Sequence, residues 1–169
     1  GLLDIASGVT QVRDPGNDNT SLLALMPRFD SGEFIGPRVF ASGFLEGKSQ
    51  FSASGGFTVQ TVEEAVGRVR WYADHGFWGI KIYNSMKPEL VPVITKAAHA
   101  AGKKVTGHIP VHMLAEEAVE AGYDGIEHIN MLFLNFLATH ETDTRDTTRF
   151  TLVGEQGAGL DLTSKKVKA

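Results

Sequence analysis

Residues 79–110, GIKIYNSMKPELVPVITKAAHAAGKKVTGHIP, decide the fold expected for this chain. The runs GIKIY (79–83) and KKVTGHI (103–109) are short, rich in β-branched residues and flanked by turn formers, so they predict strands. Residues 88–101 between them have a helical pattern and are followed by Gly102, a common helix stop. A strand, a helix and a second strand joined in this way predict a parallel βαβ unit.

The same alternation continues on both sides of this unit. Helices are expected over 61–76, where Thr61 and Glu64 form a capping-box pattern, and over 112–121. Further strands are expected in VTQVRD (9–14), PRVFASG (37–43) and GIEHIN (125–130). The class is therefore α/β with parallel strands. Residues 43–58 are interpreted as a long candidate active-site or interface loop, and 140–150 as a solvated loop.

Composition limits the class of protein. The 169 residues are 42% hydrophobic and 21% charged, which suits one globular domain with its own core. The net charge of −4, with both signs intermingled, gives no reason to expect nucleic acid or a membrane surface as a partner. There are no cysteines, so any metal must be held by nitrogen and oxygen ligands.

The termini leave the cellular location open. No apolar run reaches the roughly 18 residues of a spanning helix, and the first residues lack a signal-peptide pattern. However, GLLDIASGVT has no initiator methionine and begins as if inside a helix, so the natural start is expected upstream. A cytoplasmic location and, with an upstream signal peptide, a periplasmic or secreted one both remain open.

One ionisable residue lies near the end of each of three predicted strands: Lys81, His108 and His128. The carboxyl ends of parallel strands meet at one edge of a sheet, where α/β proteins bind ligands, so the three side chains can converge. Imidazole is the commonest metal ligand, and two of them suggest a zinc or iron site. The alternatives are a lysine that reaches solvent and histidines that are hydrogen-bonded in the core.

These segments resemble a known family. The run 79–110 together with AVEAGYDGIEHIN (118–130), and the opening GVTQVRD, are similar to the amidohydrolase superfamily, specifically its prolidase-like and imidazolonepropionase-like metal-dependent hydrolases. The resemblance implies a (β/α)₈ TIM barrel, of which this chain would supply about strands two to six. It also implies a single partial domain over 1–169, truncated at both ends, because the His-x-His pair of strand one and the aspartate of strand eight have no counterpart here.

The resemblance also implies a site. Lys81 would be carboxylated and bridge two metal ions, with His108 and His128 as ligands of one of them, so that all three are the expected catalytic and metal-binding residues. Tyr83 and Asn130 are candidate substrate-binding residues. One or two divalent ions, most simply zinc, would be held in the complete enzyme, whereas the residues of this chain suffice for one mononuclear site.

The expected function is that of a metal-dependent hydrolase that cleaves amide, peptide or ester bonds with metal-activated water. Its substrates would be small molecules: dipeptides, N-acyl amino acids or esters. Two alternatives stay open, a Schiff-base lyase that uses Lys81 as an amine nucleophile and a catalytically silent barrel fragment. A partial barrel exposes strand edges, so a homo-oligomer is expected.

Four neighbouring residues receive structural roles. Arg13 and Asp14 are expected to form a salt bridge or to cap the turn after their strand, and Glu127 to point away from His128 into the helix layer. His112 follows His108 at a helical spacing, but Pro110 between them argues against a shared metal site.

Overall fold

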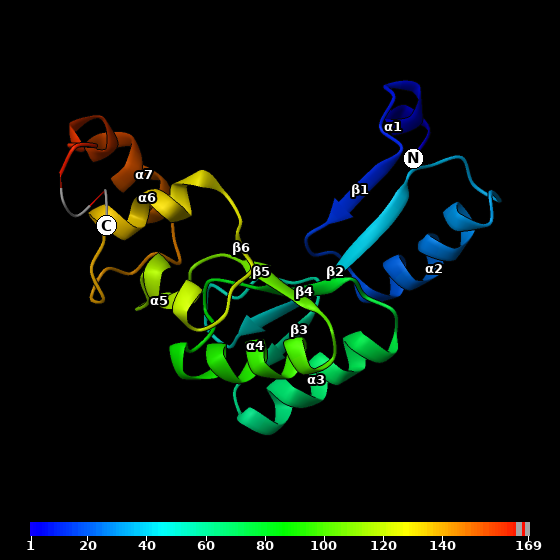
Figure 1. The fold of residues 1–169 in the computed structure, drawn as a ribbon, viewed down its shortest axis with the longest axis horizontal. Coiled ribbons are helices and arrows are strands. Elements are labelled where there is room, and N and C mark those ends of the chain that lie inside the picture. The colour runs from blue at the N-terminus through cyan, green and yellow to red at the C-terminus, as the bar shows by residue number, and fades with distance from the viewer. Residues whose placement is uncertain (165–166, 168–169) are drawn as a thin grey trace.

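Parallel strands form the centre of the protein (Figure 1). This computed structural model describes residues 1–164 and 167. Residues 165, 166, 168 and 169, at the end of the domain expected over 1–169, lie outside the described part. The sheet order is β1-β2-β4-β5-β6, and the short β3 pairs with the end of β2. The elements are α1 (Leu2–Ala6), β1 (Gln11–Asp14), α2 (Asn19–Asp30), β2 (Arg38–Gly47), β3 (Phe57–Val59), α3 (Val62–Asp74), β4 (Gly79–Ile82), η1 (Pro88–Leu90), α4 (Val91–Ala100), β5 (Lys104–Gly107), α5 (Ala115–Glu120), β6 (Gly125–Ile126), α6 (Ile129–Leu137), α7 (Thr148–Gln156) and η2 (Gly157–Gly159).

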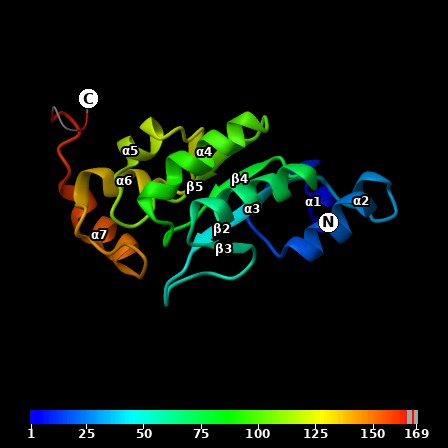
Figure 2. The ribbon, with the colours of Figure 1, turned by 90° about the horizontal axis from the view of Figure 1, so that it is seen from below.

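The helices cover one face of the curled sheet. In Figures 1 and 2, α3 and α4 lie side by side along the sheet, α2 lies at the end near β1, and α5 to α7 gather at the opposite end. Every strand pairing is parallel, as the alternation in the sequence predicts. The N-cap prediction for α3 is confirmed, since the Thr61 side chain accepts a hydrogen bond from the Glu64 N–H.

Alternation along β4 separates the core from the concave side of the sheet. Ile80 and Ile82 are fully buried with Val105 of β5 in the hydrophobic core that the helices cover. Successive side chains of a strand point to opposite faces, so Lys81 and Tyr83 project to the concave side. The register places Lys81 between Phe44 of β2 and Thr106 of β5. The concave face is therefore mixed and partly polar, whereas the face under the helices is apolar.

The end of β2 is fixed by a buried carboxylate. β2 continues to Gly47, so the loop expected over 43–58 is shorter than predicted. Both oxygens of Glu46 are engaged by backbone N–H groups, those of Gly47 and Ser85 at 2.9 and 2.8 Å and that of Ala53 at 3.2 Å. Burial raises the pKa of Glu46, although these hydrogen bonds oppose the effect. The carboxylate thereby joins the loop after β2 to the segment after β4.

A second carboxylate aligns β6 with β5. Asp124 accepts hydrogen bonds from the Lys104 ammonium at 2.8 Å, the Val105 N–H at 2.9 Å and the His99 ring at 2.9 Å. Burial raises the pKa of Asp124, but these three donors outweigh burial and bring the pKa down to about 2. Asp124 directly precedes β6, so this contact positions the strand that leads to His128.

Among the described residues, the sheet ends at β1 and β6, whose outer edges have no partner strand. An apolar groove adjoins the β6 edge and is lined by residues of α5 and α6, including the exposed Val119 and Leu132. Unpaired edges beside apolar surface favour association. No helix in the described part of the chain is long and apolar enough to cross a membrane.

We expect Asp124→Asn to lower the free energy of unfolding at neutral pH by about 1–3 kcal/mol, because a charged acceptor of three hydrogen bonds is lost. The pKa of Asp124 is lower in the folded protein than in the unfolded chain, so its stabilisation is present above about pH 4 and disappears as the pH falls toward about 2. Urea unfolding of both proteins at several pH values measures this. A difference that stays constant down to pH 2 would contradict the assignment.

The open β6 edge and its groove lead us to expect that the 169-residue chain associates in solution. Val119→Glu should reduce the associated fraction measured by light scattering, because it places a charge in the groove. Val62→Glu on α3, also exposed, is the matched control and should not change it. A monodisperse monomer for the unmodified chain would refute the expectation.

Candidate active site

A cavity of about 360 Å³ lies where the carboxyl ends of β4, β5 and β6 meet. Its size is at the lower end of the range for small-molecule sites. All five residues that the sequence singled out line it. The complete lining is Pro15, Gly16, Lys81, Tyr83, His108, His128, Asn130, Met131, Arg149 and Phe150.

Lys81 is buried in this cavity without a close counter-ion. The residue is 5% exposed, and within the described part of the chain its ammonium has no hydrogen bond or ion pair. Its nearest aromatic neighbour is Tyr83, whose ring centre lies 5.7 Å from Nζ. Burial lowers the pKa of Lys81, Glu127 and Asp14 oppose this, and Arg13 adds to it. The alternative of a lysine that extends into solvent is therefore not what the structure shows.

His108 directly follows β5 and is 4% exposed. The Asn84 Nδ2 donates to the Thr144 carbonyl, so the amide oxygen of Asn84 is the atom that faces His108. This Oδ1 accepts a hydrogen bond from the His108 Nδ1–H. Nε2 then carries the lone pair, and it is buried with no hydrogen-bond partner among the described residues. Burial, followed by the charge of Lys81, lowers the pKa of His108 to about 2, so the ring is neutral.

A tight backbone approach sets the place of His108. The preceding Gly107 has a φ of +153°, and a Cβ there would lie 2.1 Å from the Ile82 carbonyl oxygen. No other residue fits without moving β4 away from β5. The glycine thus brings the first residue after β5 close to the end of β4.

His128 reaches the cavity through an unusual backbone conformation. It is the N-cap of α6 and has a φ of +65°, in the left-handed region that non-glycine residues rarely adopt. Its ring lies 4.7 Å from that of His108, edge to face, and the His108 ring lies 4.1 Å from that of Tyr83. Burial and the charge of Lys81 lower the pKa of His128. The two imidazoles and Lys81 are thus gathered on one wall.

The other predicted neighbours divide into two groups. Asp14 caps the turn as expected, since it accepts hydrogen bonds from the Gly16 N–H at 3.0 Å and the Asn17 side chain at 3.2 Å. Glu127 was expected in the helix layer, but this is wrong, because its carboxylate pairs with Arg13 at 2.8 Å. β6 ends at Ile126, and the backbone of His128 has a left-handed conformation. The alternation of side chains along a strand therefore does not predict the direction of the Glu127 side chain.

Two residues of the site were not found from the sequence. Asn84 orients His108, although it was only part of a turn signal after the strand. Arg149 lies in the segment interpreted as a solvated loop, yet α7 begins at Thr148 and Arg149 lines the cavity. Tyr83 and Asn130 also line it, and the Asn130 side chain donates to the Arg149 carbonyl at 3.4 Å. No local pattern in 140–150 signals this placement.

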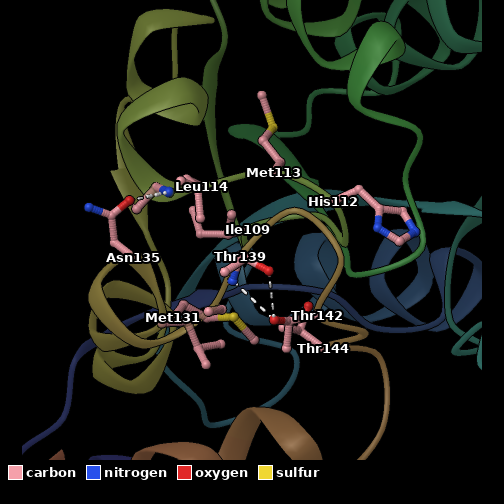
Figure 3. Close-up of a pocket in the computed structure, with 12 residues that line it drawn as sticks. Ile109, His112, Met113, Leu114, Met131, Asn135, Thr139, Thr142 and Thr144 are labelled. Atoms are coloured by element: carbon pink, nitrogen blue, oxygen red, sulfur yellow. Dashed lines mark hydrogen bonds between the residues drawn. The ribbon is translucent and has the colours of Figure 1, made fainter.

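A much smaller cavity, of about 10 Å³, lies between α5, α6 and the segment after α6 (Figure 3). Its walls are mainly apolar and threonine side chains, and Asn135 accepts from the Ala115 N–H at 2.9 Å beside it. The volume is close to that of a single water position. His112 lies at its edge, where its Nδ1 is 2.6 Å from the His140 carbonyl oxygen, and does not line the larger cavity. This space is a packing feature.

Comparison with solved structures shows what kind of sheet this is. No known family profile and no curated protein sequence matches the chain. The bottromycin amidohydrolase superimposes with a TM-score of 0.71 at 19% identity, over 91% of this chain and 33% of that protein. A prolidase complexed with N-methylphosphonate-L-proline superimposes with a TM-score of 0.65 at 23% identity, over 92% of this chain and 42% of that protein. A Xaa-Pro dipeptidase with methionine bound in its active site superimposes with a TM-score of 0.61 at 24% identity, over 89% of this chain and 41% of that protein.

The fold is that of an amidohydrolase barrel, present in part. The expected α/β class and partial TIM barrel are thus confirmed, and the chain spans a third to a half of the solved structures that it matches. In an amidohydrolase-type half-barrel, the cavity of Lys81, His108 and His128 occupies the inner side at the carboxyl ends of the strands, the usual place of barrel active sites.

We expect His108 to stay a neutral Nδ1–H tautomer from about pH 8 to about pH 5, because its folded-state pKa lies near 2, well below its ordinary range. Nitrogen-detected NMR of the metal-free protein identifies the tautomer. Asn84→Ala removes the acceptor and should produce a mixture of tautomers. A His108 signal that titrates near pH 6.5 in the unmodified protein would show that the ring is not held as described.

Proposed function

We propose that this half-barrel belongs to a metal-dependent hydrolase that cleaves amide, peptide or ester bonds of small molecules. Its neighbours in structure are amidohydrolases and prolidases, which supports hydrolysis as the class of reaction. The observation that carries the proposal is the buried, unpartnered Nε2 of His108 beside His128 and Lys81. An acceptor nitrogen with no donor is costly in the core unless a ligand such as a cation completes it.

The residues fit a metal ion. Asn84 fixes the His108 tautomer in the way that carbonyl partners orient metal-binding histidines. Burial lowers the pKa of both histidines, that of His108 to about 2, so the His108 lone pair stays free at neutral pH. Among the described residues, no three His, Cys, Asp or Glu side chains converge, so the two histidines need Lys81 to complete a set. When bound, a divalent ion, most simply zinc, would polarise a carbonyl and lower the pKa of water.

Lys81 has the properties needed for carboxylation. Burial lowers its pKa, which increases the fraction of neutral amine. That amine nitrogen can form a bond to the carbon of CO₂ and release its proton, so that a buried cation becomes an anionic oxygen ligand. This conversion explains why a lysine without a counter-ion is retained between Ile80 and Ile82. In this proposal Lys81, His108 and His128 hold the metal, and Tyr83 and Asn130 contact substrate.

Dipeptides and N-acyl amino acids are the proposed substrates, with esters as a secondary class. Two structural neighbours hold an amino acid or a proline derivative, methionine and N-methylphosphonate-L-proline. The cavity of about 360 Å³ suits ligands of that size, and Tyr83, Met131 and Phe150 give it an apolar portion.

A lowered lysine pKa would equally suit a Schiff-base enzyme, so the test must separate the two chemistries. We expect the protein to incorporate ¹³C-bicarbonate as a carbamate on Lys81 and to resist borohydride trapping with carbonyl compounds. Lys81→Ala should remove the carbamate signal. Borohydride-dependent labelling of Lys81 would instead favour the lyase.

Metal binding is the second expected outcome. The protein should bind zinc in equilibrium dialysis after chelator treatment, and Lys81→Ala or His108→Ala should abolish the tight phase. Asn84→Ala should weaken binding by about 10–100-fold, because it frees the orientation of His108. His75→Ala at the end of α3 is the control and should bind as the unmodified protein does. Chelator-insensitive hydrolysis that survives His108→Ala would refute the proposed function.

A further inference from the structure

An ion pair crosses the concave side of the sheet and joins its two outer strands. Arg13 lies on β1 and Glu127 directly follows β6, while β2, β4 and β5 lie between these two strands in the sheet. The Arg13 Nη1 nevertheless lies 2.8 Å from the Glu127 Oε1. The same nitrogen donates a hydrogen bond to the Thr106 Oγ1 on β5 at 3.3 Å. The curl of the sheet brings these side chains together, and their contact in turn resists flattening of the sheet.

The pair is better shielded than an ordinary surface ion pair, and it lies outside the cavity. The Glu127 side chain is 15% exposed and that of Arg13 38%. Both residues line a second hollow of about 340 Å³, together with Trp78, whose ring centre lies 5.6 Å from the Arg13 Cζ. Neither residue lines the cavity that holds Lys81. Any role of the pair in the site is therefore exerted through other residues.

Two consecutive side chains, those of Glu127 and His128, reach the concave side. In a regular strand, consecutive side chains point to opposite faces, so both can do this only where the backbone departs from strand geometry. The departure is at His128, whose φ of +65° is in the left-handed region. This conformation is unfavourable for a residue other than glycine and persists only where the surroundings hold it. The backbone before His128 must therefore be fixed.

Glu127 is fixed in both its main chain and its side chain. Its N–H donates to the Gly107 carbonyl at 2.8 Å, and its carboxylate is bound by Arg13. The imidazole of His128, by contrast, packs edge to face on the His108 ring but forms no hydrogen bond or ion pair within the described part of the chain. The place of the His128 ring thus depends on its backbone, and that backbone depends on Glu127.

Stabilisation of β6 alone does not account for the pair. The strand is already aligned by its parallel pairing with β5 and by the three donors to Asp124. The last paired residue of β6 is Ile126, one position before Glu127. The contacts that align β6 therefore do not determine how the chain turns at Glu127 and His128.

We propose that Arg13 is a positioning residue for His128. By holding Glu127 on the concave side, it keeps the next residue left-handed and the His128 imidazole on the cavity wall beside His108. Without the ion pair, the backbone at 127–128 is free to return to a negative φ, which moves the ring off that wall. The proposed metal site would then lose one of its two histidines. This last consequence rests on the proposed function, whereas the placement of the ring does not.

NMR of the metal-free protein tests the placement. The rings of His128 and His108 are 4.7 Å apart, so we expect a nuclear Overhauser effect between their protons. We also expect the strong effect between the amide and α protons of His128 that a positive φ produces. Arg13→Met should abolish both signals. Arg13→Lys keeps a cation for Glu127 and should retain them in part, because an ammonium lacks the planar fork of arginine.

Glu127→Gln removes the charge and keeps the shape, so it should weaken both signals, and it decides the question if Arg13→Met does not fold. Arg70→Met, an exposed position on α3, is the matched control and should keep them. Thr106→Val removes only the other hydrogen bond of Arg13 and should also keep them. Circular dichroism of each variant checks folding. Signals that are absent from the unmodified protein, or that stay unchanged in Arg13→Met or Glu127→Gln, would overturn the proposal.

Equilibrium dialysis with zinc separates this proposal from the proposed function. If the cavity binds metal, Arg13→Met should weaken zinc binding by about 10–100-fold, the range for residues that orient metal ligands, and Arg13→Lys should recover part of the loss. An unmodified protein that binds no zinc would refute the metal site and leave the NMR result standing. Tight zinc binding that Arg13→Met does not change would refute the positioning role and leave the metal site standing.

Discussion

The burial of Lys81 on the concave side of β4 is the constraint on which the site depends. Its neighbours Ile80 and Ile82 are locked into the core under the helices, so β4 cannot rotate to expose the ammonium without exposing both isoleucines. Transferring an unpaired cation from water costs several kcal/mol after relaxation, and the pKa of Lys81 is lowered as a consequence. Packing alone would disfavour a lysine at this buried position, so its presence there points to a chemical role for Lys81.

The backbone around the site is also held in constrained conformations. The close approach of β4 and β5 at Gly107 and the left-handed conformation of His128 bring two imidazoles to the side where Lys81 projects. A non-glycine residue in the left-handed region costs of order 1–3 kcal/mol and persists only when its surroundings hold it. The Asp124 contacts fix the start of β6, and α6 begins immediately after His128.

The carboxylates near the site are all engaged elsewhere, which determines the electrostatic character of the cavity. Glu127 pairs with Arg13, Asp14 caps a turn, and Glu46 is saturated by backbone donors. Among the described residues, none of these three carboxylates forms an ion pair with Lys81 or Arg149, although Glu127 and Asp14 partly offset the effect of burial on the pKa of Lys81. The result is a concave surface with two imidazoles of lowered pKa, a buried lysine that carboxylation would make anionic, and an apolar side, which suits a metal ion beside a small organic ligand.

The sequence alone determined the order of strands and helices, the parallel sheet and the three residues at the strand ends, because these follow from local periodicity and from the rule that parallel strands share one carboxyl edge. Asn84, Arg149 and the inward direction of Glu127 came only from the tertiary structure. The place of Arg149 depends on how α7 packs against α6, and that of Glu127 on where β6 ends, so neither leaves a periodic signal in its own segment. Local pattern specifies which face a side chain takes within a regular element; beyond the element's end, only long-range packing decides where it lies.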